Sequence, residues 1–378
     1  MKQVSTLYHS NKQEVFGRVT LKGKNMFKRS SYILVSDDES EFSKGYKFVI
    51  STKSISNGVV SYCKVDDLSE FEEGDVISID PQGEICFLYE ISSNSNAIFA
   101  TARCNHRCVM CPQPPIAEER DRTDFNIELI KQFDKHTKEV GITGGEPTLI
   151  GDKLFDLIRQ IKKSCPQAAI SILSNGVKFA NIDYAAKLAA CNHHDLQIDV
   201  PIFSDVAEEH NRIVGAKTFY KTALGLYNLA QFRQQIGLRV VVHKQTYKRL
   251  PQLADYIYHN FPFVCQVAFI QMETTGLAEK NLKDLWIDPY DYNNELCEAV
   301  LLLNDRGITT YIYNAQLCVL PPELRPFAKQ SISEWKDMYL PVCEGCCLKD
   351  ECAGIFSTNK KNISTHIHKI ECADSCTE

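Results

Sequence analysis

From residue 98 to residue 270 the chain alternates short β-type runs with longer amphipathic segments, and this alternation restricts the folds open to it. Helical periodicity occupies 126–138, 151–164, 181–190, 217–235 and 249–260, while the β-type runs are 98–101, 139–142, 169–173, 196–200, 238–243 and 264–270. A helix between two strands returns the chain to the same edge, so the strands pair in parallel. The pattern predicts an α/β fold, a partial (β/α)6 parallel barrel of about six strands.

Polar or glycine-rich motifs follow five of these strands, at the carboxyl ends where such barrels hold their active sites. They are residues 104–115, Gly144-Gly145-Glu146-Pro147, Ser174-Asn175-Gly176, Asp199-Val200-Pro201, and 271–276, which begins with Gln271-Met272. A glycine pair admits a ligand close to the backbone, a glutamate can pair with an ammonium group, and Ser174 and Asn175 can bond sugar hydroxyls. Any one of these motifs alone is more often an ordinary turn. In register at successive strand ends, they indicate one site.

The first of these loops carries three cysteines with C-x3-C-x2-C spacing, Cys104, Cys108 and Cys111. Three thiolates can hold three corners of a four-iron cluster and leave the fourth iron without a protein ligand. A small molecule can bind that open iron and react there. The loop therefore indicates a metal centre that binds a further ligand.

The composition narrows the protein class. The 378 residues include sixteen cysteines and carry a net charge of −6, with 44% hydrophobic residues, as in an ordinary globular protein. The charge predicts no bulk nucleic-acid binding, and no apolar run approaches the ~18–20 residues of a membrane span. The first residues lack the apolar core of a secretory signal, so we expect a cytoplasmic location and cysteines that serve metal binding more than disulfides.

The cysteine loop after the first strand, with Gly144-Gly145-Glu146-Pro147 after the second, resembles the radical S-adenosylmethionine (SAM) superfamily over roughly residues 97–280. The resemblance implies that Cys104, Cys108 and Cys111 bind a [4Fe–4S] cluster whose open iron chelates the methionine end of SAM. It also implies positions for the rest of SAM. Gly144, Gly145 and Glu146 would hold the amino group, Ser174 and Asn175 would approach the ribose or carboxylate, and Gln271 and Met272 would flank the adenine.

The chemistry implied by this resemblance is one-electron chemistry. The reduced cluster would cleave SAM to methionine and a 5′-deoxyadenosyl radical, which removes a hydrogen atom from the substrate, so initiation needs no general base. Two positions depart from the family pattern. Met110 replaces an aromatic residue before the third cysteine, and Val214 precedes Gly215 where many peptide-modifying members have arginine. Arg212 is the possible substitute for that contact with the carboxylate.

A second group of cysteines lies far along the chain, with Cys343, Cys346 and Cys352 spaced C-x2-C-x5-C and Cys318 before them. Four thiolates suit either a second iron–sulfur cluster or a zinc ion. The arrangement resembles the auxiliary-cluster extensions of peptide-modifying radical enzymes, which favours a second [4Fe–4S] cluster, with zinc as the alternative. Cys347 competes with Cys346 as a ligand. The tail residues His366, His368, Cys372 and Cys376 could bind metal, but a frayed terminus is the simpler interpretation.

Residues 1–95 contain short β-type runs separated by polar turns, such as 15–19, 32–35, 46–50, 58–62 and 76–79. This spacing predicts a small all-β domain, a barrel or meander of about five to seven strands. It contains no catalytic constellation, so we expect a structural, peptide-docking or partner-docking role. The domains expected are therefore 1–95, a radical SAM core at 96–285, and a cluster-binding extension at 286–378.

The loop that ends in Pro112-Gln113-Pro114-Pro115, together with the β-rich leader and the residues after Cys318, most resembles one of the two radical maturases of the His-Xaa-Ser repeat system. This resemblance implies a ribosomally made peptide substrate with His-Xaa-Ser repeats, a second radical maturase, a small companion protein, and an electron donor such as flavodoxin or ferredoxin. Two alternatives stay open. One is a radical enzyme acting on an RNA base or a sulfatase-type residue, and the other is a non-enzymatic zinc-binding or cluster-binding interaction protein.

Overall fold

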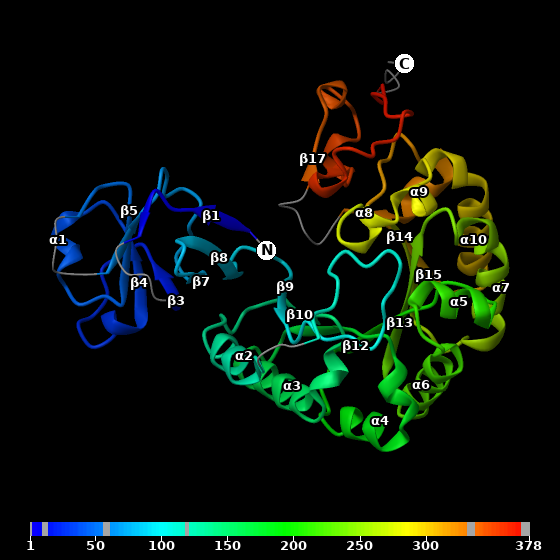
Figure 1. Ribbon diagram of the computed structural model, residues 1–378, viewed down its shortest axis with the longest axis horizontal. Coiled ribbons are helices and arrows are strands. Elements are labelled where there is room, and N and C mark those ends of the chain that lie inside the picture. The colour runs from blue at the N-terminus through cyan, green and yellow to red at the C-terminus, as the bar shows by residue number, and fades with distance from the viewer. Residues whose placement is uncertain (1, 10–13, 56–60, 118–120, 331–336, 372–378) are drawn as a thin grey trace, which may run out of the picture. The chain divides into compact units, whose positions relative to one another are not determined.

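A computed structural model describes residues 2–9, 14–55, 61–117, 121–330 and 337–371 (Figure 1). The chain divides into two compact units. The first comprises residues 1–100, 121–142 and 152–170, and the second comprises 101–120, 143–151 and 171–378. No helix among the described residues has the length and apolar character to cross a membrane.

The N-terminal part of the first unit is one eight-stranded mixed sheet with the order β1-β8-β7-β3-β4-β5-β6-β2. Its strands are β1 (Gln3–Ser5), β2 (Tyr8–His9), β3 (Val15–Thr20), β4 (Tyr32–Val35), β5 (Phe48–Ser51), β6 (Tyr62–Lys64), β7 (Val76–Ile79) and β8 (Glu84–Tyr89), with the short helix α1 (Glu39–Phe42) between β4 and β5. The all-β prediction is confirmed, but the strands do not form a meander. β3, β4, β5 and β6 pair in parallel, whereas a meander contains only antiparallel neighbours.

The first unit also contains the helices α2 (Thr123–Ile130) and α3 (Lys153–Ser164). We expected a helix over 126–138, but α2 ends at Ile130, and tertiary contacts occupy the residues beyond it. Phe133 stacks on Tyr89 with ring centroids 4.4 Å apart, and the Thr137 hydroxyl lies 3.0 Å from the Tyr89 hydroxyl. A continuing helix would turn these two side chains away from the sheet, so packing against Tyr89 overrides the local helical pattern.

A second sheet has the order β16-β15-β14-β13-β12-β11-β10-β9, and parallel pairing is seen from β12 to β16. The strands are β9 (Asn96–Phe99), β10 (Glu139–Thr143), β11 (Ala169–Leu173), β12 (Leu196–Pro201), β13 (Gln235–Val242), β14 (Gln266–Gln271), β15 (Thr309–Tyr313) and β16 (Ala328–Lys329). The α/β prediction is confirmed, and every predicted strand is present. The sheet has eight strands instead of about six, because residues after 285 add β15 and β16 beside β14.

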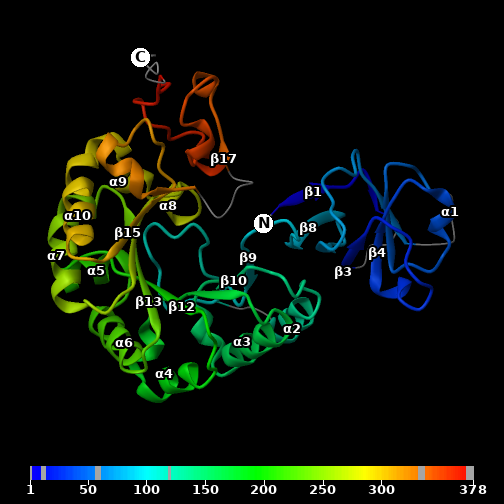
Figure 2. The same ribbon diagram turned by 180° about the vertical axis from the view of Figure 1, so that it is seen from behind.

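Helices of the second unit cover one face of these strands. They are α4 (Ile182–Ala189), α5 (Ala207–Val214), α6 (Phe219–Gln231), α7 (Leu250–Asn260), α8 (Leu277–Lys280), α9 (Leu282–Leu285) and α10 (Asn293–Asp305). Figures 1 and 2 show α4, α6 and α7 on the convex side and the cysteine loop on the concave side. Apolar residues such as Val200, Leu238 and Val240 are buried beneath the helices. The alternate residues of the strands, which are more polar, face the concave side.

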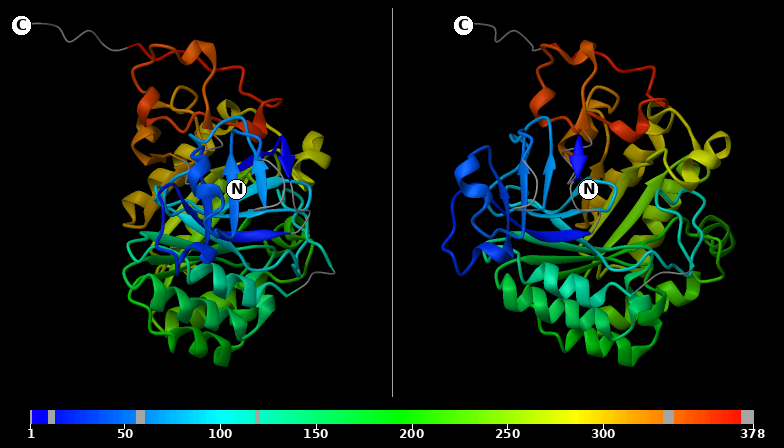
Figure 3. Two further views of the ribbon diagram at one scale, coloured as in Figure 1. Left: turned by 90° about the vertical axis from the view of Figure 1, so that its left-hand side faces the viewer. Right: turned by 60° about the vertical axis from the view of Figure 1, so that its left-hand side comes forward.

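The C-terminal residues 337–371 form a small lobe, orange to red in Figure 3, with the two-residue strands β17 (Asp337–Met338) and β18 (Ile355–Phe356). Two buried polar side chains attach this lobe to the second unit. Asp288 accepts hydrogen bonds from the Ser364 hydroxyl at 2.6 Å and the Thr365 amide at 3.0 Å. Asn359 accepts from the Thr274 amide at 2.8 Å. These bonds order the segment up to residue 371 without any metal ligand from the tail.

Candidate active site

The cysteine loop begins two residues after β9 and is held by backbone hydrogen bonds to three other segments. The amides of Gly145 and Glu146 donate to the carbonyls of Thr101 and Arg103, at 2.6 and 2.8 Å. Arg107 and Val109 donate to the end of α5, and the Leu277 amide at the start of α8 donates to the Cys111 carbonyl. The loop is therefore fixed along its length by the segments that follow β10, β12 and β14.

Four glycines make this close approach possible, Gly144, Gly145, Gly215 and Gly276. A methyl group on Gly145 would lie 2.3 Å from the Arg103 carbonyl oxygen, and one on Gly276 would lie 2.4 Å from that of Pro112. Gly276 also has a φ of +63°, a conformation that favours glycine. The sequence marked the glycine pair at 144–145 for approach to a ligand. In the structure, both glycines make room for the loop that carries the cysteines.

The three thiols of this loop lie close enough to influence one another electrostatically. Burial raises the pKa of the Cys104 and Cys111 thiols and raises that of Cys108 to about 12. Thiols with such pKa values lose their protons when a metal cation takes the proton's place. Among the described residues, no three His, Cys, Asp or Glu side chains are placed to hold one metal ion. Three separated thiols on a soft-ligand loop fit a cluster, in which each thiolate binds a different iron.

Glu146 lies at the centre of a hydrogen-bond network beside the loop and is only 1% exposed. One carboxylate oxygen accepts from the Thr148 amide, the Thr148 hydroxyl and the Ser174 hydroxyl, at 3.0, 2.6 and 2.8 Å. The other accepts from the Asn175 amide at 2.6 Å. Burial raises the pKa of this carboxyl above its ordinary value, while the four donors oppose that rise. Glu146 therefore joins the ends of β10 and β11 through the two residues predicted beside it.

Asn175 extends this network to the cysteine loop. Its side-chain amide donates to Asn105, the residue after Cys104, at 2.6 Å, and its oxygen accepts from the Val177 amide at 3.1 Å. Ser174 and Asn175 are themselves buried. The structure thus connects Glu146, Ser174 and Asn175 with Asn105 of the cysteine loop by hydrogen bonds.

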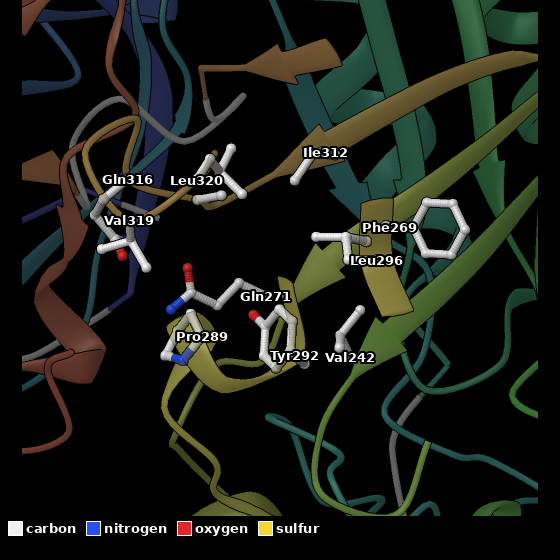
Figure 4. A pocket seen from close by; sticks show the side chains of 11 residues that line it. Val242, Phe269, Gln271, Pro289, Tyr292, Leu296, Ile312, Gln316, Val319 and Leu320 are labelled. Carbon is white, nitrogen blue, oxygen red and sulfur yellow. The ribbon is translucent and has the colours of Figure 1, made fainter. Parts of the chain in front are cut away.

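Met272 and Gln271 were predicted together, and the structure separates them. Met272 packs in an apolar cluster with Met110, which lies beside Cys111, so it contacts the cysteine loop. The Gln271 side chain points instead into a pocket lined by Pro289, Tyr292 and other residues of the extension (Figure 4). Successive side chains of a strand face opposite sides, so two neighbours at the end of β14 could not both face the loop.

Asp199 and Arg212, which the sequence also suggested for this site, lie outside the hydrogen-bond network of Glu146, Ser174 and Asn175. Asp199 lies within β12, two residues before its end, on the concave side, and accepts a hydrogen bond from Gln197 at 2.8 Å. Arg212 lies exposed in the last turn of α5 and donates to Gln245 at 2.6 Å. Its side chain bonds neither Ser174 nor Glu146.

Sequence reasoning missed some residues that shape this site. His106, between the first two cysteines, is 3% exposed and lies 2.9 Å from the Thr218 hydroxyl, while its Nδ1 atom has no partner within the described structure. The Asn281 side chain donates to the Val109 carbonyl at 2.8 Å. These contacts join residues more than one hundred positions apart, and no local pattern signals them. Gly276 is different, because it is the last residue of the motif 271–276 that the sequence had already indicated.

The second group of thiols also comes together. Cys318, Cys343, Cys346 and Cys352 line one pocket, and the amides of Leu317 and Gly354 point at the Cys352 sulfur at 3.5 and 3.4 Å. Burial raises the pKa of the Cys318 and Cys352 thiols. Cys347, the competing ligand, is disulfide-bonded, whereas Cys346 is a free thiol. His366 stacks on Tyr290 with ring centroids 3.7 Å apart, so the expected fraying of this segment is wrong, and Cys372 and Cys376 lie outside the described residues.

Comparison with known proteins supports the reading of the first loop. Residues 98–257 match the model of the radical SAM superfamily. The chain carries a radical SAM domain. Members of this superfamily are enzymes, and the domain implies a [4Fe–4S] cluster and SAM as its cofactors.

Several known proteins resemble parts of the chain. The cofactor-modifying protein of tungsten-containing aldehyde ferredoxin oxidoreductase from Pyrococcus furiosus is 30% identical over 172 residues, which cover 42% of this chain and 46% of that protein. The chain spans between 32% and 46% of the length of the curated relatives it matches.

Among solved structures, SuiB from Streptococcus suis bound to S-adenosylmethionine has a TM-score of 0.49 and 14% identity, covering 68% of this chain and 56% of that one. The AdoMet-bound anSMEcpe structure has a TM-score of 0.45 and 18% identity, covering 58% of this chain and 63% of that one.

Proposed function

We propose that this radical SAM domain is the core of a peptide maturase, which modifies a ribosomally made peptide with His-Xaa-Ser repeats. Cys104, Cys108 and Cys111 hold the [4Fe–4S] cluster. When bound, this cluster would supply one-electron reduction of SAM, the chemistry that begins hydrogen-atom removal from the peptide. The mutual proximity of the three thiols and their fixation by four glycines support this assignment.

The remaining residues of the site position SAM. We assign the methionine end to the loop backbone at Gly144 and Gly145, with Pro147 closing that turn. Glu146 acts chiefly through Ser174 and Asn175, because it already accepts four hydrogen bonds from protein donors, three of them on one oxygen. Met272 lies against the loop from the β14 side, where the adenine is proposed to bind. Gln271 points away and is not part of this assignment.

The observation that carries the peptide substrate is the second thiol pocket. We propose that Cys318, Cys343, Cys346 and Cys352 bind a second [4Fe–4S] cluster, as the extension of a peptide-modifying enzyme does. Its support is that these residues, up to 34 positions apart, line a single pocket in which backbone amides point at a sulfur. An Fe–S cluster rather than zinc is favoured because the cysteine arrangement resembles the auxiliary-cluster extensions of peptide-modifying radical enzymes.

The proposal includes partners and a division of the chain. Residues 1–95 would dock the peptide or a partner, 96–285 would carry the radical chemistry, and 286–378 would hold the second cluster. A second radical maturase, a small companion protein and a flavodoxin or ferredoxin would act with it in the cytoplasm. A radical reaction on an RNA base or a sulfatase-type residue is the second candidate, since the superfamily domain is common to all of these.

The first experiment tests the enzyme. The chain is purified without oxygen, reconstituted with iron and sulfide, reduced, and assayed for 5′-deoxyadenosine. We expect the parent and Cys265→Ala to form it and Cys104→Ala to form none, because Cys265 is an exposed thiol outside both groups. Equal product from the parent and Cys104→Ala would refute the assignment of the first cluster.

The second experiment tests the second cluster and the peptide. Combined Cys343→Ala and Cys346→Ala substitutions should lower the iron content by about four atoms per chain. Unchanged iron with loss of zinc would show a zinc site instead. Co-expression with a His-Xaa-Ser repeat peptide, followed by mass measurement, should show a mass change that Cys104→Ala abolishes. An unchanged peptide mass in the presence of active parent enzyme would rule out this substrate.

A further inference from the structure

Arg239 is a charged residue in the concave face of the second unit for which the protein supplies no direct partner. It lies within β13, three residues before the strand ends, and its exposure is intermediate. Its guanidinium forms no hydrogen bond or ion pair in the described part of the chain. By contrast, the Arg249 guanidinium is paired within the protein, where it donates hydrogen bonds to both carboxylate oxygens of Asp205. A cation left unpaired in a partly buried place is costly unless a ligand completes it.

The strand register places Arg239 directly beneath the cysteine loop. Val241, the next residue on the same face, packs against the apolar cluster that contains Met110 and Met272 and touches Cys108. Residues two apart on a strand share a face and lie about 7 Å apart. Arg239 therefore lies two residues before Val241 on the same face of β13, farther from the strand end that meets the cysteine loop. A substrate bound beneath SAM would lie at this level of the concave face.

The residues beside Arg239 on the neighbouring strands are uncharged. Pro201 and Ala268 flank it on β12 and β14, and Gly237 precedes it by two residues. Asp199 covers Gly237, since one of its carboxylate oxygens lies only 2.1 Å from where a Cβ on Gly237 would be. This places Asp199 and Arg239 on the same face, near enough to interact electrostatically but without a direct ion pair, and Tyr313 and Glu273 also interact electrostatically with Arg239. Asp199 is held by Gln197 instead.

We propose that Arg239 binds a carboxylate of the peptide substrate and so fixes the peptide beneath the radical centre. This inference rests on the proposed function and adds the class of side chain that the site recognises. A guanidinium presents two parallel N–H donors that match a carboxylate, and such a bond forms best in a partly dry pocket. SAM also carries a carboxylate, but the place proposed for its methionine end is the loop at Gly144 and Gly145, beyond the end of the strand that carries Arg239. The peptide is therefore the source that fits the depth of Arg239.

The test uses synthetic peptides of four His-Glu-Ser repeats and of four His-Gln-Ser repeats, both with amidated C-termini, and the His-Gln-Ser peptide with a free C-terminus. Their affinities for the reconstituted protein are measured with SAM present, and the affinity for SAM is measured separately. We expect a carboxylate-bearing peptide to bind about 10–100-fold more tightly than the neutral one. Whether the side chain or the C-terminus gives this gain identifies the carboxylate.

Variants assign the effect to Arg239. Arg239→Gln should reduce the acidic peptide to the affinity of the neutral one and leave SAM binding within about twofold, while Arg239→Lys should retain part of the gain, because ammonium lacks the fork. Arg159→Gln, an exposed arginine on α3, is the control and should behave as the parent does. Equal affinities of all three peptides for the parent would overturn the proposal. So would a loss of SAM affinity in Arg239→Gln with peptide discrimination intact.

A further arm separates this proposal from the proposed substrate. If the parent binds none of the repeat peptides, the His-Xaa-Ser substrate is wrong, and Arg239 is then tested with N-acetylglutamate α-amide against N-acetylglutamine α-amide. The acidic compound should raise the melting temperature of the parent more than the neutral one, and should lose this advantage in Arg239→Gln. Equal shifts in the parent would overturn carboxylate binding by Arg239.

Discussion

Replacing Glu146 by glutamine tests whether this residue organises the site or only binds SAM. The side chain is buried, and the substitution keeps its size while turning one oxygen into an NH2 group. The oxygen that accepts from Thr148 and Ser174 can be retained. The other position then places an amide donor against the Asn175 N–H, where a 2.6 Å hydrogen bond now exists. Two donors face each other there.

The magnitude follows from that lost bond. A hydrogen bond to a charged acceptor contributes about 1.5–3 kcal/mol, and a buried N–H left unpaired costs about 1–3 kcal/mol. Removing the buried charge offsets part of this loss of stability, because burial disfavours the charged form of Glu146 and so raises its pKa. We expect the free energy of unfolding to fall by about 2–4 kcal/mol. For a unit of this size the melting temperature should fall by roughly 4–12 °C.

The assay is thermal unfolding of the metal-free protein under anaerobic conditions, combined with SAM binding to the reconstituted protein. Glu128→Gln is the control, because Glu128 is exposed on α2 and its pair with Lys131 is a surface pair of small energy. A Glu146→Gln variant as stable as the parent, with SAM binding lost, would refute the structural role. It would show that Glu146 serves mainly as a ligand for the ammonium group.

Two further predictions concern the loop and its surroundings. Gly276→Ala should displace the Pro112 carbonyl and so lower the iron content after reconstitution. Gly307→Ala is the control, because Gly307 has a similar φ of +77° but open space around it, and this variant should retain iron and lose only about 1 kcal/mol in stability. Equal iron loss in both variants would show that backbone strain, and not overlap with Pro112, is responsible. Burial lowers the pKa of His210 to about 4 and of His243 to about 3, from 6.5, so the unfolded chain takes up these protons first. The free energy of unfolding should be highest above pH 6.5 and fall towards pH 4 by up to about 1.4 kcal/mol per pH unit for each histidine. In His243→Gln, chemical unfolding across this range should show a smaller decrease of that free energy per pH unit. An identical slope in that variant would contradict the assignment.

Most strands of the second sheet and both cysteine groups were accessible from the sequence, because each depends on local signals. β11 begins and ends where the apolar run at 169–173 does, and the motifs at 104, 144 and 174 follow their strands as predicted. The helix over 126–138 failed because Phe133 and Thr137 are held by Tyr89, which lies more than forty residues earlier. The joint prediction of Gln271 and Met272 did not hold for Gln271, because successive side chains of a strand face opposite sides and only one of the two can face the loop. Which one does so depends on the exact position at which β14 ends.

The sequence by itself determined the chemistry available to this protein, since cysteine spacing and glycine-rich strand ends are properties of short segments. Only the tertiary structure decided what those residues do for one another. It assigned Gly145 and Gly276 to the support of the cysteine loop and made Glu146 a link between Ser174 and Asn175. It also left the Arg239 guanidinium without a hydrogen bond or ion pair among the described residues. The physical reason is that close backbone approach, satisfaction of buried donors and the pairing of a charge depend on contacts between distant segments, which no local pattern specifies.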